Sequence, residues 1–430
     1  MGFTPLLLLY LLASLLSASD SESSFVEDDL PYLVDFYKVR HQEPELSLHE
    51  EKTAKALAGE LRQIGFEVTE QIGGHGIVAM LRNGDGPQVL YRTDMDALPM
   101  IERTELPYAS EVISENNGQQ VGVMHSCGHD MHMTVWLGTA RYLASHRDEW
   151  KGTLMLIGQP AEEIGVGAKA MLNDGLYQRF GVPDYGLALH CDPTLETGSV
   201  GLSDGYSMAN TDKMNITIYG VGSHGAAPHM SIDPIVMTAM FVMELQTIVS
   251  RNVKPIDDAV VSVGAVNGGT QFNIIPSEVQ LELTIRSYTD EVRDLVHRRI
   301  REIAEGVALA AGLPKEKYPK VFNFDDAYTP ANFNEANLTQ FVRASAIKSI
   351  GEEHVFEAEP MMVGEDFARY GRTADEVPTV LYWLGTVTEE KIAAGDLPGL
   401  HSPYYYPEIE ETISTGVRVN VQTLRDLMPK

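Results

Sequence analysis

The chain has 430 residues, which is too long for one compact core, so two domains are expected. Hydrophobic residues make up 44% and charged residues 22%, as is usual for a folded protein. The 61 acidic residues outnumber the 32 basic ones and give a formal charge of −29, which argues against nucleic acid and anionic membranes as partners, because both need basic patches.

The N-terminal stretch is apolar. Residues 1–19 contain no charged side chain, and Pro5–Leu16 is mostly apolar but too short to span a bilayer. Small residues follow at 17–19, a pattern typical of a secretory signal peptide, although the first basic residue is Lys38. We expect residues 1–19 to be a signal peptide and the protein to be exported, to a periplasm or outside the cell. The alternatives are an uncleaved anchor or a misassigned start.

Regular elements follow. Helical spacing of apolar residues predicts helices over Leu30–Arg40 and Glu50–Gly65, and a strand pair is predicted over Phe66–Gln71 and His75–Leu81. A further helix is predicted over Thr134–His146. These elements indicate an α/β domain.

Polar side chains follow three predicted strands. Asp94 and Asp96 follow Gln88–Tyr91, Glu162 and Glu163 follow Gly152–Ile157, and His190 follows Tyr185–Leu189. Each alone is more typical of a solvated turn or a structural histidine. Because α/β proteins bind ligands at the carboxyl ends of their strands, the repetition predicts one shared site. Period-two geometry places both aspartates on one side, whereas adjacent glutamates point in opposite directions.

The stretch at 124–132, MHSCGHDMH, is the densest in potential metal ligands. Cys127 and His129 lie two residues apart, and thiolates and imidazoles are zinc ligands. Alone, the stretch is equally compatible with a polar loop that carries a buried thiol. The only other cysteine is Cys191. A Cys127–Cys191 disulfide is the alternative, but we favour Cys127 as a metal-bound thiolate and Cys191 as a thiol.

A second domain interrupts the first. The order β-α-β-β-α-β, a split-βαβ arrangement, is predicted over Asp212–Tyr219, Ile232–Arg251, Ala259–Val266, Val279–Arg286, Asp290–Gly312 and Lys320–Phe324. We therefore expect a first catalytic part at 25–207, a lid at 208–325 and a second catalytic part at 326–430. Gly-rich loops in the lid display His224 and Asn273. Taken alone, each is more typical of a turn whose polar side chain caps its own backbone.

These residues together predict metal-assisted hydrolysis of an amide. Five candidate ligands exceed the need of one tetrahedral zinc and suit two metals roughly 3.5–4 Å apart. Glu162 is the candidate general base, Asp96 would orient a ligand, and His224, Asn273 and Arg286 would contact the substrate. The five candidate metal ligands are Cys127, His129, Glu163, His190 and His401.

The motifs resemble those of the co-catalytic metallohydrolases that include aminoacylases, carboxypeptidase G and related di- and tripeptidases. The most similar branch contains hippurate hydrolases, bacterial N-acyl-amino-acid amidohydrolases and plant indole-acetyl-amino-acid hydrolases. The matching segments are RTDMDALPM (92–100), HSCGHDMH (125–132), GQPAEE (158–163), ALH (188–190), GSHGAAPH (222–229), NIIP (273–276), GEDF (364–367) and HSP (401–403).

The resemblance implies the same five metal ligands, with Glu162 as the general base and Asp96 as the aspartate that orients a ligand. It also implies a homodimer formed through the lid, in which His224 completes the oxyanion site, sometimes from the partner subunit. Asp94 stands where other branches carry a histidine ligand, and Cys191 is outside the family pattern, as a plain packing residue would be. The Cys127-Gly128-His129 signature indicates the amidohydrolase branch.

The sequence thus predicts an α/β enzyme with a mixed, mostly parallel sheet flanked by helices and a smaller ferredoxin-like α+β domain. We expect it to hydrolyse N-acyl-L-amino acids with two divalent cations, Zn²⁺ or Mn²⁺. Imidazole–carboxylate sites also accept Ni²⁺ or Co²⁺, and the single thiolate favours zinc only slightly. The alternatives are a dipeptidase or carboxypeptidase of the same family and a ligand-binding protein on the same fold. Intact Glu162 argues against the last of these.

Overall fold

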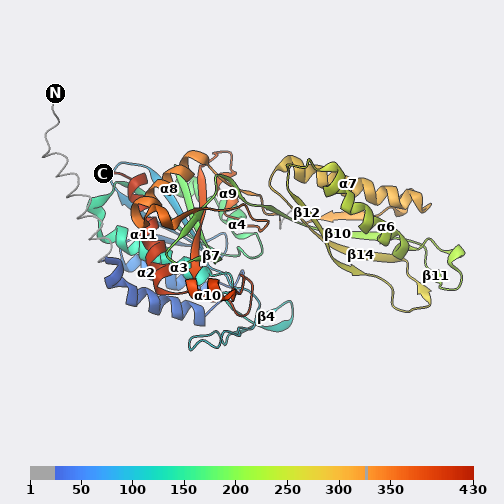
Figure 1. Ribbon diagram of the computed structural model, residues 1–430, viewed down its shortest axis with the longest axis horizontal. Coiled ribbons are helices and arrows are strands. Elements are labelled where there is room, and N and C mark those ends of the chain that lie inside the picture. Colours follow the sequence, from blue (N-terminus) through green and yellow to red (C-terminus); the bar gives the residue numbers. More distant parts are fainter. Residues whose placement is uncertain (1–24, 325–327) are drawn as a thin grey trace, which may run out of the picture. The chain divides into compact units, whose positions relative to one another are not determined.

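The computed structural model of the protein describes residues 25–324 and 328–430, which form two compact units (Figure 1). The predicted signal peptide lies outside the described residues. The larger unit comprises the residues up to Gly205 together with Phe333–Glu359 and Arg369–Lys430, and the smaller unit comprises Tyr206–Asn332 and Pro360–Ala368. Within the described ranges, no helix has the length and apolar character needed to cross a membrane.

The segment Pro360–Ala368 groups with the smaller unit, whereas the sequence pattern placed it in the larger one. The backbone explains the difference. The N–H of Ala209 donates to the carbonyls of Met361 and Val363 at 3.0 and 2.9 Å, so the returning chain is bonded to the start of the smaller unit.

An eight-stranded mixed sheet forms the centre of the larger unit. In its middle, β3 pairs in parallel with β6 and β7, and β7 pairs in parallel with β18. Strands β3, β6 and β18 are almost entirely buried, as expected for strands covered on both faces. The strand order is β1 (Glu67–Ile72), β2 (Gly76–Asn83), β6 (Gly152–Gln159), β3 (Gln88–Asp94), β7 (Tyr185–Glu196), β18 (Thr379–Val387), β8 (Val200–Leu202) and β17 (Val355–Glu357).

Helices pack on this sheet and complete one hydrophobic core, so the predicted α/β class is confirmed. Helix α3 packs on β3 and also contacts α2 and α11, while α11 contacts α8. The helices are 25–42, α2 (Glu51–Gln63), α3 (His129–Ser145), α4 (Gly167–Asn173), α5 (Leu176–Phe180), α8 (Ala336–Ile350), α9 (Ala368–Gly371), α10 (Glu389–Ala394) and α11 (Glu410–Leu427).

Helix α3 begins at His129, five residues before the predicted start at Thr134. Gly128 precedes it with φ 82, a backbone conformation that glycine adopts without strain. Nearly every residue of α3 is buried, so no polar face marked its first turn in the sequence. His129 is therefore the first residue of the helix rather than a loop residue before it.

The smaller unit has the predicted β-α-β-β-α-β order. Its antiparallel sheet runs β12 (Ala259–Asn267), β14 (Glu278–Ser287), β10 (Asn210–Tyr219) and β15 (Lys320–Asn323). Helices α6 (Pro234–Thr247) and α7 (Asp290–Ala310) contact each other and β14, and they cover one face of the sheet (Figure 1). The predicted long helix over Ile232–Arg251 is α6 followed by a π-helical turn at Ile248–Asn252.

Several short strands were not predicted from the sequence. A hairpin in the larger unit joins β4 (Ile113–Asn116) and β5 (Gln119–Gly122). In the smaller unit, β11 (Ser223–His224) pairs with β13 (Ile274–Ile275). The remaining short strands are β9 (Gly205–Met208) and β16 (Asn332–Asn334).

Candidate metal centre

The candidate site lies where β3, β6 and β7 present their polar residues. β3 ends at Asp94, three residues beyond the predicted strand Gln88–Tyr91, and β6 ends at Gln159, two residues beyond the predicted strand Gly152–Ile157. The strand β7 differs from expectation, because it continues through His190 to Glu196. Of the remaining candidates, Cys127 lies in the loop before α3, His129 is the first residue of α3, and His401 lies in the loop before α11, so five separate chain segments meet in the larger unit.

The structure brings the five predicted ligands together in two groups that share Cys127. One group joins Cys127 to His129 and His190, and the other joins it to Glu163 and His401, with the candidate ligand atoms of each group within 4.8 Å of one another. The Cys127 Sγ lies 3.3 Å from His401 Nε2 and 3.6 Å from His190 Nε2. The carboxylate oxygen Glu163 Oε2 lies 3.4 Å from His401 Nε2.

Two buried polar atoms in this cluster face each other without a hydrogen-bond partner among the described residues. They are His129 Nε2 and Glu163 Oε1, and they lie 3.8 Å apart. Glu162 Oε2 and Asp94 Oδ2 lie 4.0 and 3.7 Å from the same nitrogen. Buried polar groups are almost always satisfied, so a bare imidazole nitrogen among carboxylates fits a divalent cation.

Asp96 holds the groups around the cluster rather than pointing a carboxylate into it. Its side chain accepts the backbone N–H groups of Glu162 and Glu163 at 3.1 and 3.0 Å and the hydroxyl of Ser47 at 2.6 Å. Its backbone carbonyl accepts His129 Nδ1–H at 2.8 Å, which leaves Nε2 as the nitrogen that would bind a metal once its proton is displaced. Such bonds orient metal ligands and fix their tautomers. Sequence reasoning missed Ser47, for which no motif gave a signal.

His132 and Asp94 are both fully engaged with other groups. The Nδ1 of His132 lies 2.7 Å from Asp94 Oδ1, and its Nε2 accepts the backbone N–H of Cys191 at 2.9 Å. Burial lowers the pKa of His132 to about 4, so the ring is neutral and has no nitrogen left for a metal. The other oxygen of Asp94 accepts from buried Arg92 Nη1 at 2.7 Å.

The electrostatics of the cluster favour an added positive charge. Burial disfavours a charged His129, but the carboxylate of Asp94 and its neighbours outweigh burial and raise the pKa of His129 to about 10. Burial also raises the pKa of Glu163 to about 8. In the absence of a metal the cluster therefore retains protons at neutral pH, and a divalent cation would displace them.

Both cysteines are free and no disulfide joins them, so the alternative of a Cys127–Cys191 disulfide is wrong. Cys191 is buried, and burial raises the pKa of its thiol well above the usual value, so it stays protonated. Its Sγ lies 3.9 Å from the carbonyl oxygen of Gly128, in the loop that carries Cys127. These contacts fit a packing residue.

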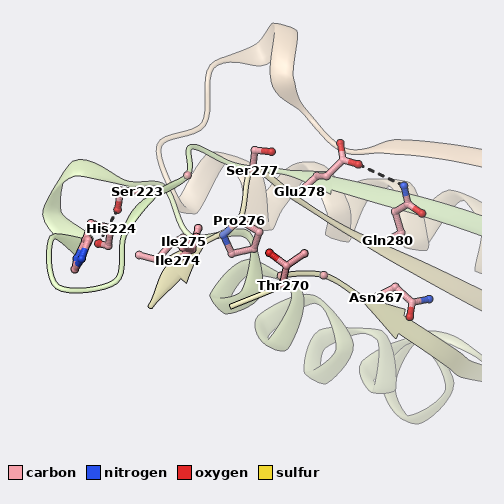
Figure 2. A pocket seen from close by; sticks show the side chains of 13 residues that line it. Ser223, His224, Asn267, Thr270, Ile274, Ile275, Pro276, Ser277, Glu278 and Gln280 are labelled. Atoms are coloured by element: carbon pink, nitrogen blue, oxygen red, sulfur yellow. Dashed lines mark hydrogen bonds between the residues drawn. The ribbon is translucent and has the colours of Figure 1, made fainter. Parts of the chain in front are cut away.

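The three candidate substrate residues lie in the smaller unit and do not all meet there. The N–H of Gly225 donates to the carbonyl of Asn273 at 2.7 Å, so the loops of His224 and Asn273 lie side by side. Figure 2 shows His224 at one end of a hollow of about 810 Å³ that Thr270, among others, also lines. Glu278, the first residue of β14, also lines this hollow, and Arg286 lies eight residues further along, roughly 26 Å at 3.3 Å per residue.

Arg286 is tied to a different neighbourhood. It pairs in register with Thr211 on β10 and hydrogen-bonds to the Thr211 hydroxyl. It is half-buried, and burial lowers its pKa. Within the smaller unit, Arg286 and His224 therefore present their side chains at opposite ends of β14.

Comparison with known proteins decides the family. A model of peptidase family M20/M25/M40 matches residues 90–426. The chain belongs to this family. It is 40% identical over 338 residues to a hippurate hydrolase of Campylobacter jejuni, covering 77% of this chain and 84% of the relative. It is 36% identical over 348 residues to an N-acetyl-L-cysteine deacetylase of Bacillus subtilis, covering 80% of this chain and 78% of the relative.

Solved structures of the family agree with this fold. A protein from methicillin-resistant Staphylococcus aureus superposes with a TM-score of 0.83 at 31% identity, covering 95% of this chain and 100% of that one. A dinuclear metal-binding peptidase of the M20 family from Bacillus subtilis superposes with a TM-score of 0.73 at 29% identity, covering 92% and 98%. The chain is thus an M20-family hydrolase that acts on amide bonds, and it carries groups of side chains that could hold metal ions.

Proposed function

We propose that this M20-family hydrolase cleaves the amide bond of N-acyl-L-amino acids and releases a carboxylic acid and a free amino acid. The main support is the open cluster around His129 Nε2, which fits a cation and lies beside the candidate base Glu162. The named activities of the relatives, hippurate hydrolysis and N-acetyl-amino-acid deacetylation, are reactions of this class.

In this proposal Cys127, His129, Glu163, His190 and His401 hold two divalent cations, Zn²⁺ or Mn²⁺, with Ni²⁺ or Co²⁺ as further occupants. Bound there, the cations would polarise the amide carbonyl and lower the pKa of water. Cys127 belongs to both ligand groups and would be shared between them.

Glu162 would transfer the proton. Its carboxylate is almost buried and lies 4.0 Å from His129 Nε2, while Asp96 holds its backbone N–H. From this position it would take a proton from the attacking water and give it to the leaving nitrogen. His224 would stabilise the developing oxyanion, and Asn273 and Arg286 would bind the substrate carboxylate.

The test is a substrate panel measured before and after chelation and metal add-back. It contains hippurate, N-acetyl, long-chain acyl and indole-acetyl amino acids together with unblocked dipeptides. We expect cleavage of blocked substrates only when metal is present. Cleavage of free dipeptides alone would assign the protein to the peptidase branch, and no turnover with metal bound would favour a binding protein.

We also propose a homodimer formed through the smaller unit. Four exposed apolar side chains lie on α6, namely Ile235, Val236, Met240 and Met243, and β12 is the edge strand of the sheet beside it. A small N-acyl amino acid is much shorter than β14. His224 and Arg286 could therefore contact one substrate only if one of them came from a second copy.

Light scattering tests the dimer. Met243→Glu should give a monomer, whereas Leu309→Glu, at an equally exposed apolar position on α7, should leave the mass unchanged. Co-expressed His224→Ala and Glu162→Gln chains should recover part of the activity in mixed dimers, because one site then contains both native residues. A monomeric wild type would refute the dimer, and mixed dimers without activity would refute the sharing of His224 between subunits.

We further propose that residues 1–19 direct export. N-terminal sequencing of the protein from the medium or the periplasm tests this, because a mature chain beginning after residue 19 is expected. Retention of the intact chain inside the cell would refute export.

A further inference from the structure

Glu50 is a fully buried carboxyl that no motif singled out, and it lies immediately before α2. One of its oxygens, Oε1, accepts two backbone N–H groups, from Leu48 at 2.9 Å and from Ala161 at 2.8 Å. Both donors have positive φ, 69 for Leu48 and 52 for Ala161. Non-glycine residues adopt this left-handed conformation at a cost and keep it only when their surroundings enforce it.

The two segments that Glu50 joins are the same two that Asp96 joins. Ser47, next to Leu48, donates its hydroxyl to Asp96, and the residues after Ala161 donate their N–H groups to Asp96. The loop that carries Glu162 and the ligand candidate Glu163 is thus fixed by consecutive bonds, first from Ala161 to Glu50 and then from its next two residues to Asp96.

We propose that Glu50 is a positioning residue that holds Ala161 in its left-handed conformation and so places the general base Glu162 and the ligand Glu163. This inference rests on the proposed amidohydrolase function. Glu50 acts on this loop through the backbone of Ala161, whose N–H it accepts. A shift of about 1 Å in such a base can cost about 100-fold in rate.

The bonds of Glu50 require an acceptor at the right reach rather than a negative charge. Both N–H groups use Oε1, and Oε2 is buried with no hydrogen-bond partner among the described residues. Burial, with the charge of Asp96, raises the pKa of Glu50 to about 7. A glutamine at 50 keeps the acceptor without the charge, whereas an aspartate keeps the charge but is one methylene too short.

The experiment compares Glu50→Gln, Glu50→Asp and Glu50→Ala in the full-length metal-loaded protein. Glu45 supplies the matched control, because it lies in the same segment and accepts the backbone N–H groups of Lys52 and Thr53 at 3.2 and 2.8 Å, away from Ala161. Turnover of the best N-acyl amino acid gives kcat and KM. Hydrogen exchange of peptides covering 160–166 reports the protection of the Ala161 N–H, and this measurement depends on neither substrate nor metal.

We expect Glu50→Ala and Glu50→Asp to lower kcat about 10- to 100-fold with KM changed by less than about threefold, and to speed hydrogen exchange in 160–166. Glu50→Gln should keep the wild-type kcat and the wild-type exchange rate. Glu45→Ala should be less stable than the wild type, with kcat and the exchange protection of 160–166 unchanged. If Glu50→Ala does not fold, Glu50→Asp carries the same expectation.

Unchanged exchange and kcat in Glu50→Asp and Glu50→Ala would overturn the positioning role. Loss of kcat in Glu50→Gln equal to that in Glu50→Asp would also overturn it, because charge would then be the requirement. A wild type that cleaves no N-acyl amino acid would refute the proposed function instead, and the exchange data would still decide whether Glu50 holds Ala161.

Discussion

Two buried clusters of histidine and carboxylate lie on either side of the start of α3. His129 belongs to the candidate metal centre, and the next residue, Asp130, belongs to a cluster with His41 and Glu102. In the second cluster both ring nitrogens of His41 are bonded, at 2.6 Å to Asp130 Oδ2 and at 3.1 Å to Glu102 Oε1. In the first, His129 Nε2 has carboxylate oxygens only at 3.7–4.0 Å.

The difference distinguishes an internal ion pair from a cation site. Burial opposes a charged His41, but its bonds to Asp130 and Glu102 outweigh burial and raise its pKa to about 9, so His41 supplies the positive charge of its own cluster. The spacing around His129 is too long for hydrogen bonds and leaves room for an added ion. A closed cluster stabilises the fold, and an open one is available for chemistry.

Replacing Glu162 by glutamine should have the largest effect on turnover. The amide keeps the shape but cannot accept the proton, so kcat should fall about a thousand-fold, within the range for loss of a general base. Metal content, measured by mass spectrometry of the elements, should stay at the wild-type value. Glu163→Gln is the matched control, because it should lose metal as well as activity. Near-normal turnover in Glu162→Gln would remove Glu162 from the mechanism.

The two cysteines give the next test, because Cys127 is a candidate ligand in the open cluster and Cys191 is a buried packing residue. Cys127→Ala should weaken metal binding more than about 100-fold, because loss of outer-shell partners alone costs 10- to 100-fold and Cys127 belongs to both ligand groups. Cys191→Ala removes a buried thiol with a raised pKa and should leave metal affinity unchanged. Equal affinities for the two variants, measured by competition with a chelating dye, would contradict the ligand role of Cys127.

Sequence patterns predicted which side chains come together in this open cluster, because motifs and strand ends mark residue types, while the roles of these residues stay predictions. Cys127, His129 and Glu162 follow from motifs and strand ends. The opposite placement of His224 and Arg286 did not follow, because it depends on the pairing register of β14, which no motif records.

The bracing of the loops was not predictable for a related reason. The positive φ of Ala161 and the bonds of Glu50 arise only when segments 111 residues apart meet. The β4–β5 hairpin did carry a signal that was overlooked, because Asn117-Gly118 is a typical two-residue turn and both residues have positive φ.

The closed cluster predicts a pH effect on stability. The pKa of His41 is raised from 6.5 to about 9, so its contribution is fully present below pH 6.5 and is lost as pH rises through 9. At about 1.36 kcal/mol per unit, the contribution is about 3 kcal/mol. Denaturant unfolding followed by tryptophan fluorescence reports the larger unit, which contains Trp136, Trp150 and Trp383.

His41→Gln is the comparison variant for that measurement. The difference in unfolding free energy between wild type and His41→Gln should shrink by about 3 kcal/mol between pH 6.5 and 9.5. A difference that stays constant over this range would mean that His41 is neutral in the folded protein, and the contrast between the two clusters would then lose its basis.

The smallest expected effect comes from Ser47. Its hydroxyl donates to Asp96 at 2.6 Å, but Asp96 keeps its bonds to the backbone of Glu162 and Glu163 when the hydroxyl is removed. Ser47→Ala should therefore cost about 1 kcal/mol, the usual value of one hydrogen bond, and lower kcat no more than about fivefold. Steady-state kinetics measures this, with Ser47→Thr as the variant that keeps the hydroxyl. A loss as large as that expected for Glu50→Ala would show that the loop depends on Asp96 alone, because Glu50 remains intact in Ser47→Ala.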